Sequence, residues 1–172
     1  GDNDILLGTR NGKSIRFSEE QIRPSGRKTM GVKGITLSSK DDKLVGMLLI
    51  KREGTTVLVA TEKGFGKRTE ISQYRAQKRG GKGVLTMKTT DKVGKMVTIK
   101  EVVDKDDLMI ITNQGVLIRQ PVAQIRAIGR ATQGVKLIKL GEGTLVSSIT
   151  RIMSEEEDGD ENNSAEPAGD SE

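Results

Sequence analysis

The chain has 172 residues, with 29 basic and 24 acidic side chains and neither cysteine nor histidine. The absence of both residue types excludes disulfides, the common zinc sites, thiol nucleophiles and histidine bases, and it fits a reducing cytoplasm. Apolar runs such as residues 47–50 are too short to cross a bilayer, so we expect no membrane partner.

Charge is distributed unevenly along the chain. Residues 155–172 hold nine acidic and no basic side chains, which leaves the rest with 29 basic against 15 acidic side chains, a net charge of +14. Such a surplus favours a polyanionic partner, either nucleic acid or an anionic surface, over simple solubility. The acidic end also lacks aromatic and β-branched residues, so we expect residues 154–172 to be a disordered acidic tail.

The first predicted elements form a β-hairpin over residues 5–16, in which Asn11-Gly12 is a strong two-residue turn signal. A polar crossing follows, in which residues 19–22 could form a helical turn. Alternating apolar residues then predict a third strand over residues 31–37 and a fourth over 44–50.

The same series recurs twice. The predicted hairpins, third strands and fourth strands cover residues 57–68, 83–87 and 96–103 in the second repeat and 108–119, 134–140 and 145–152 in the third, with a helical turn possible within 122–128. Five positions keep a spacing of 52 and then 51 residues: Thr9, Thr61 and Thr112; Gly12, Gly64 and Gly115; Arg16, Arg68 and Arg119; Arg27, Arg79 and Arg130; Gly31, Gly83 and Gly134.

A period of about 50 residues predicts stacked β-units, each burying its apolar face against the next. We therefore expect an all-β, propeller-like disc with about three four-stranded blades, covering about 1–50, 51–102 and 103–153. Propellers need at least four blades to close. Because the chain also begins without methionine, we expect it to be part of a longer protein.

Residues 77–83, with the sequence Gln-Lys-Arg-Gly-Gly-Lys-Gly, form the most distinctive segment. Three glycines permit positive φ and a close approach of backbone N–H groups to a phosphate, and three cations supply countercharge; the alternative is a flexible turn. The spacing is not that of a nucleotide-triphosphate loop. With only three aromatic residues and no recognition helix, the chain favours sequence-tolerant contact with the backbone of duplex DNA.

The wider segment 71–84, together with the degenerate copies at 26–32 and 129–135, resembles the box of the C-terminal domain of DNA gyrase A. The usual box has arginine where this chain has Lys78, and the resemblance extends over residues 1–153. It implies a β-pinwheel, a disc whose repeats exchange strands, that wraps DNA so that a bacterial ATP-dependent type II topoisomerase introduces negative supercoils.

The resemblance also implies where the chemistry lies. This fragment would be non-catalytic and without a metal or cofactor, with ATP and Mg²⁺ bound elsewhere in the parent enzyme. The expected partners are double-stranded DNA, the parent subunit dimer and gyrase B in the A2B2 complex, in the bacterial cytoplasm at the nucleoid.

The resemblance assigns DNA binding to the box and to basic residues on neighbouring blades: Gln77, Lys78, Arg79, Gly80, Gly81, Lys82, Gly83, Arg75, Arg27, Lys28, Arg130 and Lys136. Arg79 and Lys82 are the leading candidates for phosphate contact, while Gln77 and the glycines shape the loop. Arg16, Arg68 and Arg119 fit pairing with acids as well as DNA contact. Tyr74 is expected to pack rather than react, and the acids at residues 41–42 and 104–107 to be solvated rather than to bind a metal.

Two alternatives remain open. The topoisomerase IV counterpart of this C-terminal domain bends DNA but has a degenerate box, so the intact segment 77–83 favours gyrase. A protein-binding propeller would instead require an apolar patch on one face of the disc. In the gyrase family the box usually lies in the first blade, which leaves open whether this second-repeat copy is the decisive one.

Overall fold

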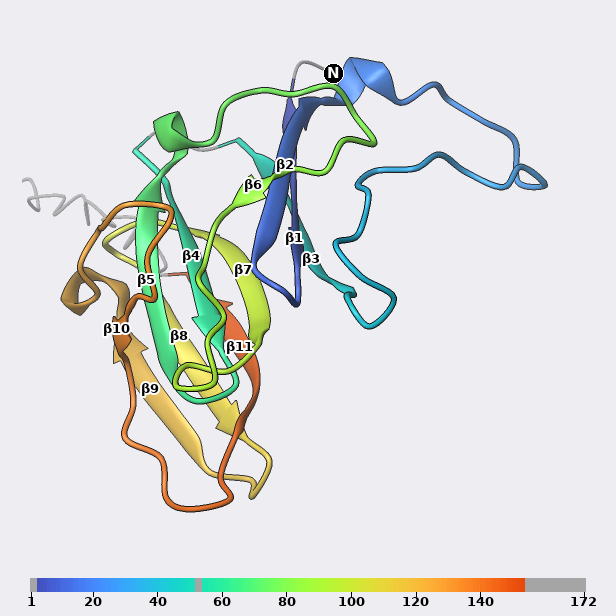
Figure 1. Ribbon diagram of the computed structural model, residues 1–172. Helices are drawn as coiled ribbons and strands as arrows, with labels where there is room; N and C mark the ends of the chain where they lie inside the picture. Colours follow the sequence, from blue (N-terminus) through green and yellow to red (C-terminus); the bar gives the residue numbers. More distant parts are fainter. Residues whose placement is uncertain (1–2, 52–53, 154–172) are drawn as a thin grey trace, which may run out of the picture.

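The computed structural model describes residues 3–51 and 54–153, which form three antiparallel β-sheets set side by side (Figure 1). Each sheet is built on the hairpin of one repeat, and the three hairpins are β1 (Asp4–Thr9) with β2 (Lys13–Ser18), β4 (Thr56–Thr61) with β5 (Phe65–Glu70), and β8 (Asp107–Thr112) with β9 (Leu117–Pro121). A further strand pairs with the first strand of each hairpin: β3 (Leu44–Ile50), β7 (Met96–Val102) and β11 (Val146–Ile152). The predicted all-β, pinwheel-like fold is confirmed.

Each hairpin turn is fixed by a threonine and a glycine. The hydroxyl of Thr9 accepts a hydrogen bond from the backbone N–H of Lys13 at 3.2 Å, and the corresponding threonines of the other two repeats make the same contact. Gly12 has φ +83°, and a Cβ there would lie 2.1 Å from the carbonyl oxygen of Met87. These contacts explain why threonine and glycine recur in register.

In the first two sheets, the outer strand comes from the following repeat. Strand β6 (Val84–Leu85) pairs with β2, and β10 (Val135–Lys136) pairs with β5. The third strands predicted over 83–87 and 134–140 are therefore too long, because the backbone N–H groups of Thr86 and Met87 both turn to the carbonyl of Gly12 and end the ladder.

The prediction of four strands for every repeat is wrong for the first repeat, which has three. Residues 31–37 contain no strand. The equivalent strands β6 and β10 each pair with the sheet of the repeat before them, and this chain has no repeat before the first. In Figure 1 this segment forms part of the loop that projects away from the sheets. Correspondingly, the third sheet has the order β11-β8-β9 and lacks an outer strand within the described residues.

Apolar side chains are exposed on the segment that joins no sheet and on the sheet that has no outer strand. Met30 and Val32 are exposed on the projecting segment, as are Val116 and Leu117 at the free edge of the third sheet. At the equivalent positions beside a neighbouring blade, Val84 and Phe65 are partly buried, so the exposure of Val32 and Val116 agrees with the lack of an adjacent blade within the described residues.

Two of the three apolar clusters span adjacent sheets. Met87, from the second repeat, is fully buried in a cluster with Leu6 of β1 and Val57 of β4. Ile138 occupies the corresponding position in the cluster between the second and third sheets. Because burial of apolar surface is the main stabilising term in folding, adjacent blades stabilise one another and do not fold as independent units.

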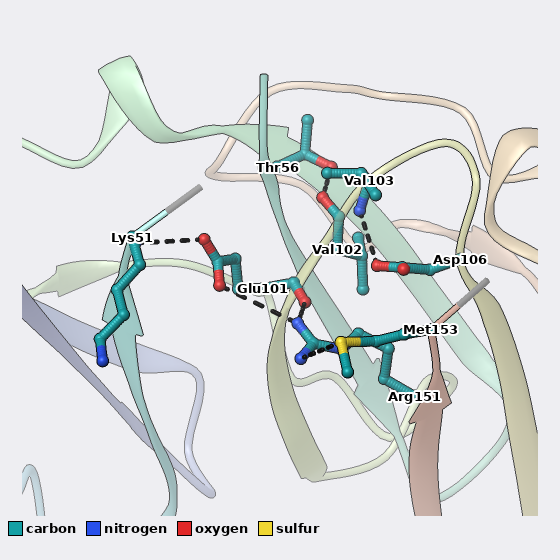
Figure 2. A network of polar contacts seen from close by, with 8 residues as sticks. All are labelled: Lys51, Thr56, Glu101, Val102, Val103, Asp106, Arg151 and Met153. Atoms are coloured by element: carbon teal, nitrogen blue, oxygen red, sulfur yellow. Dashed lines mark hydrogen bonds and ion pairs between the residues drawn. The ribbon is translucent and has the colours of Figure 1, made fainter. Parts of the chain in front are cut away.

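The three blades also meet in a polar network around Glu101 of β7 (Figure 2). The Oε1 atom of Glu101 accepts a hydrogen bond from the backbone N–H of Lys51 at 3.3 Å, and its backbone carbonyl accepts one from Arg151 Nη1 at 2.7 Å. Arg151 Nη1 also lies 3.9 Å from Glu101 Oε2. One residue of the second blade thus contacts segments of the first and third.

Short 3₁₀ turns follow the second hairpin strands, at Glu19–Gln21, Ile71–Gln73 and Val122–Gln124. The turn predicted within 122–128 is therefore shorter than expected, and the one at 71–73 was not predicted. The predicted disorder of residues 154–172 falls outside the described residues. Across residues 3–51 and 54–153, no helix is long and apolar enough to span a membrane.

Candidate nucleic-acid interface

The box belongs to a loop that crosses from the second sheet to the first. It starts after the turn Ile71–Gln73, passes over the junction between the two sheets in Figure 1, and ends in β6 on the edge of the first sheet. The backbone N–H of Gln77 donates to the carbonyl of Arg16 at 2.8 Å, and Thr36 donates through its hydroxyl to the carbonyl of Gly80 at 2.7 Å. The box is thus fastened to the first blade.

The glycines of the box permit this close packing. Gly80 and Gly83 have φ of +82° and +70°, and a Cβ on Gly83 would lie 2.3 Å from the carbonyl oxygen of Ser14. The sequence suggested that the box N–H groups face a phosphate, yet four of the seven, those of Gln77, Arg79, Gly80 and Gly81, donate to protein acceptors. Any electrostatic attraction of a ligand therefore comes mainly from side chains.

The cations of the box divide into two kinds. Lys78 and Lys82 are exposed, and neither side chain makes a hydrogen bond or ion pair with another described residue. Arg79 instead donates from Nε to the carbonyl of Gln21 at 3.0 Å and from Nη1 to the carbonyl of Lys33 at 2.6 Å. The lysines are thus available to an anion, whereas two of the three nitrogens of the Arg79 guanidinium are occupied.

Exposed arginines recur beside the box in every repeat. Arg23, Arg75 and Arg126 occupy the second position after each 3₁₀ turn, at spacings of 52 and 51 residues, and all three are exposed. None of their side chains makes a hydrogen bond or ion pair to any part of the chain that the structure describes. Sequence reasoning named only Arg75, although the repeat spacing was a sufficient signal for the other two.

The remaining predicted residues differ in their surroundings. Arg27 and Lys28 are exposed on the projecting loop of the first repeat. Lys136 lies in β10 with its Nζ 5.6 Å from the ring centroid of Phe65, a cation–π geometry. Arg130 contacts the second blade in the same way that Arg79 contacts the first.

The arginines that end the hairpins are paired with acids. Arg16 contacts Asp4 at 2.5 Å, Arg119 contacts Asp107 at 2.6 Å, and Arg68 contacts Asp104. The side chains of Arg16 and Arg68 are 23% and 11% exposed and also reach carbonyls of the next blade, whereas Arg119, without a next blade, is 64% exposed. Of the two roles left open for these arginines, the structure shows the pairing with acids.

Lys67 is a buried cation that the sequence did not reveal. Its Nζ donates to the carbonyl of Gly129 at 2.7 Å and to the hydroxyl of Thr132 at 2.9 Å, and it also contacts the carbonyl of Arg130. Burial, with a smaller contribution from the charge of Arg130, lowers the pKa of Lys67 to about 8. Lys67 thus anchors the third-repeat copy of the box to the second sheet.

Tyr74 packs in the core, as predicted. It is 1% exposed, its hydroxyl lies 2.6 Å from that of Thr86, and burial raises its pKa. The expectation that the acids at residues 41–42 and 104–107 are solvated is wrong for Asp42 and Asp106, which are buried. Both hold loop backbone in place: Asp42 accepts from the backbone N–H of Asn11 at 2.9 Å, and Asp106 accepts from that of Val103 at 2.9 Å. No cluster that could hold a metal occurs among the described residues.

Three strand-exchanging sheets with exposed basic loops between them define a β-pinwheel module. The chain belongs to the family of the DNA gyrase C-terminal domain, a β-propeller, whose family model matches residues 3–51, 55–102 and 106–152. The resemblance of residues 1–153 to that domain is therefore confirmed.

Curated relatives support the same assignment. The chain is 48% identical over 158 residues to the DNA gyrase A protein of Staphylococcus epidermidis and 47% identical over 167 residues to that of Staphylococcus aureus strain MRSA252. These alignments cover 91% and 96% of the chain but only 18% of each relative. The chain thus spans about a fifth of the length of the relatives it matches.

Solved structures share the fold. A DNA gyrase A C-terminal domain superposes with a TM-score of 0.81 at 24% identity, covering 88% of this chain and 51% of that one. The C-terminal domain of a DNA topoisomerase IV gives a TM-score of 0.83, also at 24% identity, covering 89% and 47%. The fold does not separate the two enzymes, whereas the sequence relatives favour gyrase.

Proposed function

We propose that this chain is a non-catalytic module that binds and wraps duplex DNA for a type II topoisomerase of the gyrase class. The observation that carries the proposal is the recurrence of Arg23, Arg75 and Arg126, one on each blade, exposed and without a bonding partner among the described residues. Lys78 and Lys82 add two free cations where the box crosses between the first and second blades.

This arrangement suits the backbone of a duplex better than its bases. Evenly repeated cations meet evenly repeated phosphates, and each contact that releases a counterion contributes affinity independent of sequence. Bending a site of 20–30 base pairs costs about 1–6 kcal/mol, which contacts on successive blades offset. The predicted site residues Arg27, Lys28, Arg75, Lys78 and Lys82 stay in the proposal as phosphate contacts, now with Arg23 and Arg126.

The parent enzyme supplies the remaining parts of the proposed reaction. Its proposed partners are double-stranded DNA, the subunit dimer and gyrase B in the A2B2 complex, with ATP and Mg²⁺ bound outside this chain in the bacterial cytoplasm. By directing how DNA crosses itself before strand passage, the wrap would give supercoiling its negative sign.

A salt series with a matched pair of variants tests the proposal. Fluorescence anisotropy with a labelled duplex measures how log affinity falls with log salt concentration. The triple variant Arg23→Gln, Arg75→Gln and Arg126→Gln should flatten that slope by about 3, since each phosphate contact contributes about 0.9.

The control removes three charges at the other end of the blades. Lys40, Lys43 and Lys92 lie in the turns that precede β3 and β7, opposite the 3₁₀ turns, and all three are exposed. The variant Lys40→Gln, Lys43→Gln and Lys92→Gln should change the slope by less than about 1. Equal slopes for both variants, or wild-type binding that does not respond to salt, would contradict the proposal.

A further inference from the structure

The arginine of the box makes all its hydrogen bonds within the protein to the preceding blade. The backbone N–H of Arg79 donates to Gln21 Oε1 at 2.7 Å, its Nε donates to the carbonyl of Gln21 at 3.0 Å, and its Nη1 donates to the carbonyl of Lys33 at 2.6 Å. Gln21 ends the 3₁₀ turn of the first blade, and Lys33 lies in the first repeat's crossing segment. The guanidinium fork thus spans two separate segments of one neighbour.

The same arrangement recurs at the next junction. The backbone N–H of Arg130 donates to Gln73 Oε1 at 3.0 Å, and its Nη1 contacts the carbonyl of Leu85. Gln73 and Leu85 lie 52 residues after Gln21 and Lys33, so the partners are equivalent in the repeat. The guanidinium contacts differ at Nε of Arg130, which is buried without a partner among the described residues. Two copies of one geometry at two junctions indicate a structural role of the repeat.

The geometry requires arginine. The planar fork carries donors on separate nitrogens, so Nε and Nη1 reach carbonyls of two different segments; a lysine has a single nitrogen and cannot place donors at both positions. The acceptors are neutral carbonyls, so the positive charge is held in position without being neutralised by a carboxylate. The lysines on either side of Arg79 have no such contacts and remain free.

We propose that Arg79 and Arg130 are positioning residues that fasten each blade to the preceding one and thereby set the angle between successive basic loops. The inference rests on the proposed DNA-wrapping function and divides the box into two parts. Lys78 and Lys82 contact phosphate, whereas the arginine holds the loop that carries them. Loss of the arginine therefore reduces the bending of bound DNA without removing a phosphate contact.

Four single variants separate this role from direct phosphate contact: Arg79→Gln, Arg79→Lys, Gln21→Ala and the matched charge control Lys82→Gln. Three quantities are measured for each: the midpoint of urea unfolding, the salt slope of duplex affinity, and the bend of a short duplex by energy transfer between dyes at its ends. We expect Lys82→Gln to lower the slope by about 1 and to leave the unfolding midpoint unchanged.

Arg79→Gln should lower the unfolding midpoint and the bend while leaving the salt slope within experimental error of wild type. Arg79→Lys should behave like Arg79→Gln, because it restores charge but not the fork. Gln21→Ala removes no charge, yet it should reproduce both losses. Gln21→Ala breaks the bond between Gln21 Oε1 and the backbone N–H of Arg79, whereas Arg79→Gln breaks the bonds of the guanidinium to the carbonyls of Gln21 and Lys33. Because these bonds belong to one junction, the double variant should lose less stability than the sum of the two single losses.

The opposite pattern would overturn the inference. If Arg79→Gln lowered the slope by about 1 and Arg79→Lys restored it, the arginine would be a phosphate contact. If the effects of Gln21→Ala and Arg79→Gln on unfolding simply added, the two residues would not act together. The comparison of urea unfolding among the wild type, the two single variants and the double variant needs no DNA. It therefore tests the contact between blades even if the chain bound no duplex at all.

Discussion

Replacing Lys67 with methionine should change how stability depends on pH. The side chain of Lys67 is fully buried, and its ammonium has only carbonyl and hydroxyl oxygens as partners. The equivalent positions in the other repeats hold Ile15 and Ile118, so the strand tolerates an apolar side chain there. Methionine keeps the length and removes the titrating group.

The magnitude follows from the lowered pKa. Lys67 has a pKa of about 8 in the folded protein against 10.5 when solvated, so the folded state binds fewer protons than the unfolded state between these values. The free energy of unfolding of the wild type therefore rises with pH across that window, whereas below pH 8 the full cost of burying the charge is present. Between pH 7 and pH 9.5 the gain from this residue is about 2 kcal/mol.

Urea unfolding at pH 7, 8, 9 and 9.5 measures this difference, with wild type and Lys67→Met compared at each pH so that other titrating groups cancel. We expect the wild type to gain about 2 kcal/mol relative to the variant across the series. Parallel profiles would refute the argument. They would mean that the surrounding oxygens stabilise the ammonium enough to keep its pKa near the solvated value.

Three other outcomes follow from contacts already described. Gly12→Ala should lower the free energy of unfolding by about 2 kcal/mol more than Gly115→Ala. Both glycines have positive φ, but only Gly12 has atoms within 4 Å of a new Cβ. Urea unfolding of both variants measures the difference. Glu101→Ala should lower the free energy of unfolding by about 1–3 kcal/mol in the same assay, since it leaves Arg151 with only carbonyl and sulfur partners among the described residues. A loss no larger than that for an exposed glutamate would contradict the bridging role. Deleting residues 155–172 removes nine acids. If these acids compete for the basic loops, as we predict, duplex affinity should tighten, most strongly at low salt. Equal affinities of intact and truncated chains at low salt would make the acidic segment irrelevant to binding.

The hairpins and the strands β3, β7 and β11 could be predicted because their signals are local. A glycine at each turn and alternating apolar residues on either side placed β1, β2 and β3 close to their observed bounds. Strand exchange has no local signal, since the pattern of residues 83–87 is the same whichever sheet accepts it. The same limit hid Lys67, because β5 is covered on both faces and its middle residues are buried in succession instead of alternating.

The candidate site was predictable only in part for a similar reason. The exposure of Lys78 and Lys82 agrees with what a polar, glycine-rich loop suggests. The occupied guanidinium of Arg79 depends on Gln21 and Lys33, which lie 58 and 46 residues earlier, and no local rule joins positions so far apart. Arg23 was within reach of sequence reasoning, because its spacing to Arg75 equals the repeat.

Exchange of the outer strand has a consequence for how such a disc can change in size. The second and third repeats each give a two-residue strand to the sheet before them, so the unit of duplication is offset from the unit of folding. Insertion or loss of one whole repeat of 51 or 52 residues keeps this offset, because each repeat brings one sheet together with one strand for the sheet before it. The number of blades can therefore vary in steps of one without redesign of any junction, whereas a cut at any other place creates two unmatched edges at once.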